Sequence, residues 1–118
     1  MKNENDERAL MLAAESGWLD VVRYLIDKGT DVNTVDWSGG TALILAAGNG
    51  HLDVVQYLID KGANVNAKNK YGETALMNAA NKGYLNVVRY LVDKDANINA
   101  TYDSGTALAR AARNGHLD

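Results

Sequence analysis

The chain has 118 residues, of which 47% are apolar and 23% charged, so it has the length of about one globular domain and enough apolar side chains for a core. Its formal net charge of −3 argues against a role in binding nucleic acids or anionic membranes, because proteins with either role are usually basic. The absence of cysteine excludes disulfides, thiolate nucleophiles and sulfur-ligated zinc.

The amino-terminal segment, residues 1–8, is mostly polar and lacks the apolar stretch of a secretory signal peptide. The longest uncharged apolar segment, around residues 41–48, is far shorter than the ~20 residues that a membrane-spanning helix needs. The sequence therefore predicts a soluble, cytoplasmic protein without a membrane segment.

The sequence repeats itself with a period of 33 residues. The longest repeated segment lies at 19–29, 52–62 and 85–95. A Thr-Ala-Leu segment followed by an Ala-Ala pair starts at Thr41, Thr74 and Thr106, the last after an offset of 32. A unit of this size cannot bury its apolar faces alone, so the copies are expected to stack into a solenoid with a shared core.

Each copy has the pattern of a helix, a turn, a second helix and an extended loop. Thr41 is the expected N-cap of a first helix, and a Gly ends that helix. Asp20 and Asp53 are the expected N-caps of second helices, whose apolar positions have helical spacing. The Asx and Gly residues at 36–39 and 69–72 then predict a tight turn within a projecting hairpin.

The repeated unit resembles the ankyrin repeat. That family has the same period and the pattern Asp-x-x-Gly-x-Thr-Pro-Leu-His, Ala-Ala, Gly-His-Leu and Gly-Ala-Asp-Val-Asn-Ala, which is matched from Asn3 to Asp118. In the second copy the matching residues are Asp36, Gly39, Thr41, Leu43, Ala46, Ala47, Gly50, His51, Leu52, Val54, Val55, Gly62, Ala63, Val65, Asn66 and Ala67. The chain departs from the pattern in having Ala-Leu-Ile at 42–44, so the hydrogen bonds of the family's histidine are absent.

The resemblance implies an all-α repeat solenoid of stacked helix-turn-helix units with projecting β-hairpin loops. We expect one domain, 1–118, with repeats at about 3–35, 36–68 and 69–101 and a truncated repeat at 102–118. The first copy lacks the hairpin and begins with polar residues, as an amino-terminal capping repeat does. The last copy stops where its second helix should begin. The sequence is therefore expected to be part of a longer array or to self-associate through this open end.

The histidines do not indicate catalysis. His51 and His116 occupy the same place in copies two and four, where Trp18 and Tyr84 stand in copies one and three. This recurrence favours a ring packed over the turn between helices rather than a base or a metal ligand. No paired carboxylates, nucleophile motif or phosphate-binding loop stands out, so we expect no enzyme activity, cofactor or metal.

Functional residues are expected at positions that vary between copies. In the family that the sequence resembles, the hairpin tips and the inward surface of the first helices form a concave face that binds partners. The resemblance thus assigns partner binding to Trp37, Ser38, Leu45, Asn49, Lys70, Tyr71, Asn78, Asn81, Lys82, Tyr102, Arg110 and Arg113. For the tip aromatics, Trp37, Tyr71 and Tyr102, the alternative is that they only pack one hairpin against the next.

Two other repeated sets are interpreted as structural. The amides of Asn33, Asn66 and Asn99 are expected to bridge adjacent hairpins. The tyrosines at 24, 57 and 90 recur without change on the second helices, which favours packing between copies.

The leading hypothesis is a non-catalytic module that binds another protein, with no nucleic acid and no membrane as partner. The alternative is a structural or engineered repeat scaffold with no dedicated partner, which self-associates through its uncapped carboxyl-terminal end.

Overall fold

The computed structural model describes residues 4–94, 101–102 and 105–106. The described helices are α1 (Glu4–Ser16), α2 (Leu19–Asp27), α3 (Ala42–Gly48), α4 (Leu52–Asp60), α5 (Ala75–Lys82) and α6 (Leu85–Asp93). Two short strands, β1 (Thr101–Tyr102) and β2 (Gly105–Thr106), pair antiparallel. No helix in the described part of the chain is long and apolar enough to cross a membrane.

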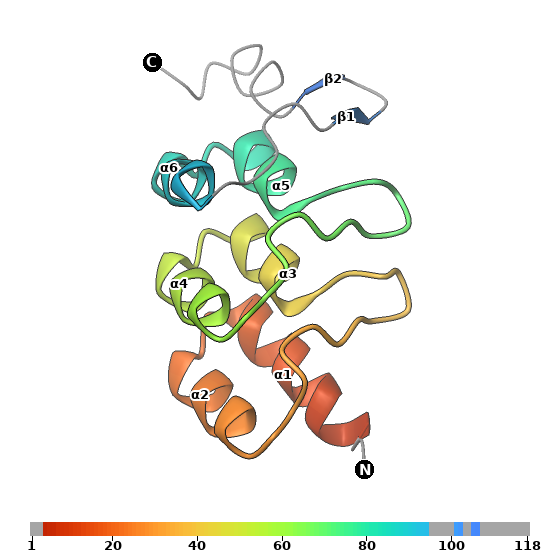
Figure 1. Ribbon diagram of the computed structural model, residues 1–118, viewed down its shortest axis with the longest axis vertical. Helices are drawn as coiled ribbons and strands as arrows, with labels where there is room; N and C mark the ends of the chain where they lie inside the picture. Colours follow the sequence, from red (N-terminus) through yellow and green to blue (C-terminus); the bar gives the residue numbers. More distant parts are fainter. Residues whose placement is uncertain (1–3, 95–100, 103–104, 107–118) are drawn as a thin grey trace.

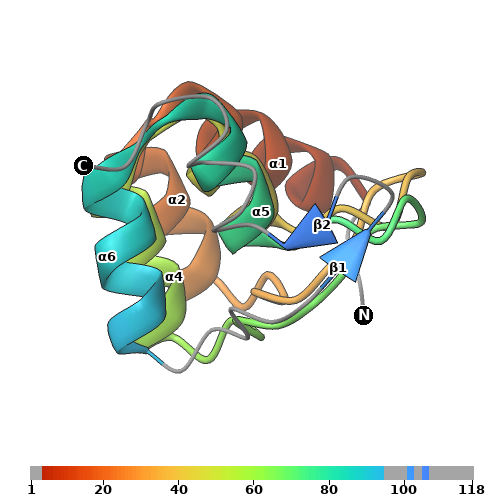
Figure 2. The same ribbon diagram turned by 90° about the horizontal axis from the view of Figure 1, so that it is seen from above.

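The helices stack in two layers, as the repeat pattern predicts. Helices α1, α3 and α5 contact one another in sequence, as do α2, α4 and α6 (Figure 1). Figure 2, which looks along the stack, shows the second helices on one side and the loops projecting from the other. We call residues 30–41 the first finger and residues 63–74 the second finger. This architecture confirms the predicted helical repeat fold.

The first helices begin where the sequence predicts. The hydroxyl oxygen Oγ1 of Thr41 accepts a hydrogen bond from the backbone N–H of Ile44, at 3.2 Å. Thr74 makes the equivalent bond to the N–H of Met77, also at 3.2 Å. Each threonine thereby satisfies an N–H that has no partner within its helix. Beyond the caps, buried alanines on α3 and α5 allow the two helices to approach closely.

The second helices begin earlier than predicted, and the assignment of Asp20 and Asp53 as N-caps is wrong. Helix α4 starts at Leu52 with His51 as its N-cap, and no side chain caps it. The start is set by the preceding turn, because the N–H of Leu52 donates to the carbonyl oxygen of Gly50 at 3.1 Å. Asp53 lies inside the first turn, where its Oδ1 accepts from the N–H of Val54 and its charge suits the helix dipole.

Aromatic and imidazole rings cover the turns between paired helices. Gly17 and Gly50 have φ near +80° and +76°, and a Cβ atom at Gly17 would lie 2.6 Å from Nδ1 of His51. At Gly50 it would lie 2.8 Å from Cδ1 of Tyr84. Nε2 of His51 also lies 3.0 Å from the carbonyl oxygen of Glu15. The predicted packing of His51 over an inter-helix turn is confirmed, whereas His116 lies outside the described residues.

The fingers are joined at their bases by an asparagine. The side-chain N–H of Asn33 donates to the carbonyl oxygen of Gly62 at 3.1 Å, and its Oδ1 accepts from the N–H of Asn64 at 2.8 Å. These bonds confirm the bridging role predicted for Asn33. Asn99 lies outside the described residues.

Candidate functional site: fingers and first helices

The turn of the first finger is built on one carboxylate. Oδ1 of Asp36 accepts hydrogen bonds from the N–H groups of Ser38 and Gly40, both at 2.9 Å, and from the Ser38 hydroxyl at 2.8 Å. Partial burial acts to raise the pKa of Asp36, but these hydrogen bonds outweigh burial and the pKa is lowered. In the second finger, Asn69 Oδ1 accepts from the N–H groups of Tyr71 and Glu73 in the same way.

Replacing Asp36 by alanine is expected to lower the free energy of unfolding by about 1–3 kcal/mol, because two buried or half-buried N–H groups lose a charged acceptor. Asp36→Asn should lose less stability, since the amide oxygen of Asn69 accepts the equivalent hydrogen bonds in the second finger. Because the folded pKa is lowered, the charged form stabilises the fold fully above the ordinary Asp pKa of about 3.9. The difference in the free energy of unfolding between the wild type and Asp36→Asn should therefore shrink as the pH falls through the folded pKa of Asp36. Urea unfolding at several pH values measures both effects, and equal losses for the two variants would contradict the assignment.

The finger tips carry an exposed aromatic and cationic cluster. Nζ of Lys70 lies 4.5 Å from the ring centroid of Trp37 and 5.4 Å from that of Tyr71. The N–H of Lys70 also donates to the carbonyl oxygen of Ser38 at 2.7 Å, which joins the two fingers. Trp37 is 81% exposed and Tyr71 is 56% exposed, so the contact between fingers leaves most of both rings free for contact. We call Trp37, Lys70 and Tyr71 the tip cluster.

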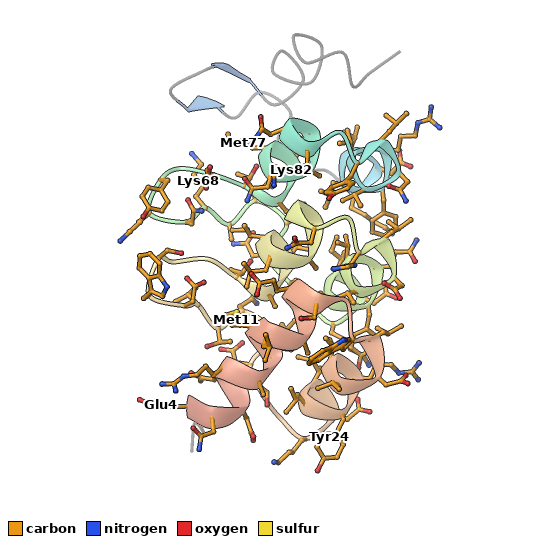
Figure 3. All side chains as sticks on the ribbon, turned by 180° about the vertical axis from the view of Figure 1, so that it is seen from behind. Glu4, Met11, Tyr24, Lys68, Met77 and Lys82 are labelled. Carbon is orange, nitrogen blue, oxygen red and sulfur yellow. The ribbon has the colours of Figure 1, made fainter. Side chains whose placement is uncertain are left out.

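A hollow of about 270 Å³ lies between the first helices. Among the residues that line it are the predicted site residues Leu45, Asn49, Asn78, Asn81 and Lys82. Figure 3 labels Lys82 at the end of α5, on this surface. We call this hollow the α3–α5 groove. Its lining offers amides, an ammonium group and the half-buried Leu45, which is a set suited to contacts with another protein surface.

A second hollow, of about 400 Å³, lies between α1 and the first finger. It is lined by Glu4, Glu7, Arg8, Met11, Val35, Asp36 and Trp37, of which the sequence pattern predicts only Trp37 as a site residue. The exposed Leu12 was also missed, although it has the same place in its copy as Leu45. Comparison of helix registers, applied to the first copy as well, would have found Leu12.

Not every predicted site residue is placed. The hydroxyl of Ser38 is committed to Asp36, so this side chain shapes the turn. The backbone of Tyr102 lies in β1, while Arg110 and Arg113 fall outside the described residues. Within the described ranges, no group of three or more metal-ligating side chains comes together.

A comparison with protein-family models identifies the repeated unit. A family model described as ankyrin repeats (3 copies) matches residues 1–69 and 64–118, which together span the chain. No curated protein matches the chain.

Proposed function

Since the chain belongs to the ankyrin-repeat family, whose members generally act as protein–protein interaction modules, we propose that it binds a partner protein through the tip cluster and the α3–α5 groove. The role proposed is recognition, without catalysis and without a cofactor. The fingers project on the side opposite the second helices (Figure 2), and the α3–α5 groove lies between first helices, so neither surface involves the layer of second helices.

The exposure of Trp37 carries this proposal. An indole that is 81% exposed leaves a large apolar surface in water, and tryptophan is enriched among the residues that dominate binding energy. Lys70 holds the ring from the neighbouring finger, which limits the conformational entropy that binding would otherwise cost. Trp37 also lines the hollow beside α1, so the tip cluster and that hollow form one continuous surface.

The charges of this surface favour a protein over a polyanion. Glu4, Glu7 and Asp36 line the hollow beside α1, and Glu73 lines the α3–α5 groove together with Lys82. A phosphate backbone would meet carboxylates along much of this path. A protein surface, which carries charges of both signs, matches it better.

An aromatic photocrosslinking residue placed at position 37, which keeps a large ring in the place of the indole, tests the proposal, with position 56 as its control. Trp37 is in the tip cluster, whereas Gln56 is exposed on α4, in the layer of second helices. In extracts of the source cell, the residue at 37 should become crosslinked to one protein, and a residue at 82 should capture the same protein. Equal capture of that protein from position 56, or none from position 37, would contradict the proposed surface.

A further inference from the structure

Successive second helices are seated on one another through a tyrosine. The hydroxyl of Tyr57 on α4 donates to Oδ1 of Asp27 on α2 at 3.3 Å, and the guanidinium carbon of Arg23 lies 5.9 Å from the Tyr57 ring centroid. Burial, followed by the negative charge and hydrogen bond of Asp27, raises the pKa of Tyr57. An Arg–Asp pair spaced four residues apart on one second helix thus receives the tyrosine of the next. The predicted packing between copies is confirmed for Tyr57, but it is wrong for Tyr24, which is 66% exposed.

The outward face of α2 carries a valine and a tyrosine at the same positions, with Trp18 in the place of His51, and no second helix packs on it in the described part of the chain. Trp18, Val21 and Tyr24 are exposed, and Tyr24 is 66% exposed. Their counterparts in the next pair are covered: Val54 is fully buried, and Tyr57 is half-buried against α2. Figure 3 places Tyr24 at the end of the stack that is opposite α6. The face through which α4 packs on α2 is therefore open on α2 itself.

Helix α6, the last helix in the described part of the chain, repeats the receiving surface. Arg89 and Asp93 stand at the positions that Arg23 and Asp27 occupy on α2, and both are exposed. Val92 between them is 38% exposed, which is high for a valine on a packing helix. Helix α4 differs here, because Gln56 replaces the arginine. Helix α6 therefore carries the same Arg–Asp pair as α2, where the pair receives Tyr57.

We propose that two copies of this chain stack head to tail, with Trp18, Val21 and Tyr24 of one copy on α6 of the other and Tyr24 seated at Arg89 and Asp93. The contact continues the interfaces that join α2 to α4 and α4 to α6. The two faces of this contact differ. An assembly of any length therefore keeps one free α2 face and one free α6 face, and it can grow into a linear oligomer. This self-association uses neither the tip cluster nor the α3–α5 groove and stands apart from the proposed partner binding.

Light scattering on the 118-residue chain, from micromolar to millimolar concentration, measures the assembly. The weight-average mass of the wild type should rise more than two-fold above the monomer. An α2-face variant, Val21→Lys with Tyr24→Ala, and an α6-face variant, Arg89→Ala with Val92→Lys, should each remain monomeric. A mixture of the two variants should form a one-to-one dimer and nothing larger, because each supplies the face that the other lacks.

Two checks keep this test specific. The substituted side chains are exposed, so both variants should retain the wild-type thermal unfolding midpoint, and a variant that does not is replaced by its single substitutions. Trp37→Lys, which removes an exposed aromatic elsewhere, should assemble as the wild type does. A wild type that is monomeric throughout overturns the proposal, as does a mixture that stays monomeric. An α6-face variant that still dimerises alone also overturns it, since two α2 faces would then be meeting each other.

Discussion

Replacing Gly50 by alanine will lower the free energy of unfolding by about 2–5 kcal/mol. The backbone of Gly50 has a φ of +76°, where an alanine is strained by about 1–2 kcal/mol. Its Cβ would also lie 2.8 Å from Cδ1 of Tyr84, and relieving such an overlap in a packed region costs about 1–3 kcal/mol. Urea unfolding followed by circular dichroism measures the loss.

Gly62→Ala is the matched control for this prediction. Gly62 has a φ of +97°, but a Cβ there would meet nothing within 4 Å, so only the backbone strain of about 1–2 kcal/mol applies. Introducing Gly50→Ala into a Tyr84→Ala background should likewise remove the overlap, with a coupling of about 1–3 kcal/mol. Equal losses for Gly50→Ala and Gly62→Ala, or no coupling with Tyr84, would show that the ring does not require the glycine.

The features that the sequence predicts well are those that depend on chemistry within a few residues. The caps at Thr41 and Thr74 require only a side-chain oxygen before a helix, and both are present. The turn glycine at 50 and its covering ring recur in register, so the stacking of one copy on the next could be expected from the repeat alone. The helical repeat fold follows from these local signals and the period.

The start of the second helices shows where local chemistry misleads. Asp53 precedes an apolar helical stripe and so has the sequence pattern of an N-cap. The Gly50 turn instead starts the helix at Leu52 and leaves the aspartate inside the first turn. Backbone geometry set by the preceding glycine outweighs the capping preference of the side chain.

The arrangement of the candidate site depends on distances between copies, which no local pattern contains. That Lys70 would lie between Trp37 and Tyr71 follows from how far apart the two fingers stand. The sequence does not predict the hollow beside α1, because the polar residues at the start of the first copy are typical of a capping repeat. The aromatic face of α2 is exposed, so the polar residues of α1 do not cover it.

Removing both tip aromatics is expected to have the largest effect on binding. Truncating an aromatic side chain at the centre of an interface costs about 2 kcal/mol or more, which corresponds to a loss of affinity of about 30-fold. Trp37→Ala with Tyr71→Ala removes both rings that flank Lys70 and leaves that lysine without its aromatic neighbours. The fold should be little affected, because both side chains are exposed and the finger turns rest on Asp36 and Asn69.

Tyr24→Ala is the matched control for the tip variant. Tyr24 is an exposed aromatic on α2, at a distance from the fingers, and its loss should leave partner affinity unchanged at concentrations where the chain is monomeric. A loss of affinity common to both variants would indicate a general effect of removing surface aromatics.

The most direct test of partner recognition by the fingers is isothermal titration calorimetry. The partner protein that crosslinking from position 37 identifies is titrated separately with the wild type, with the tip variant and with Tyr24→Ala. We predict that the dissociation constant rises about 30-fold or more for Trp37→Ala with Tyr71→Ala and stays at the wild-type value for Tyr24→Ala. An unchanged dissociation constant for the tip variant would contradict the assignment of the fingers as the partner-binding surface.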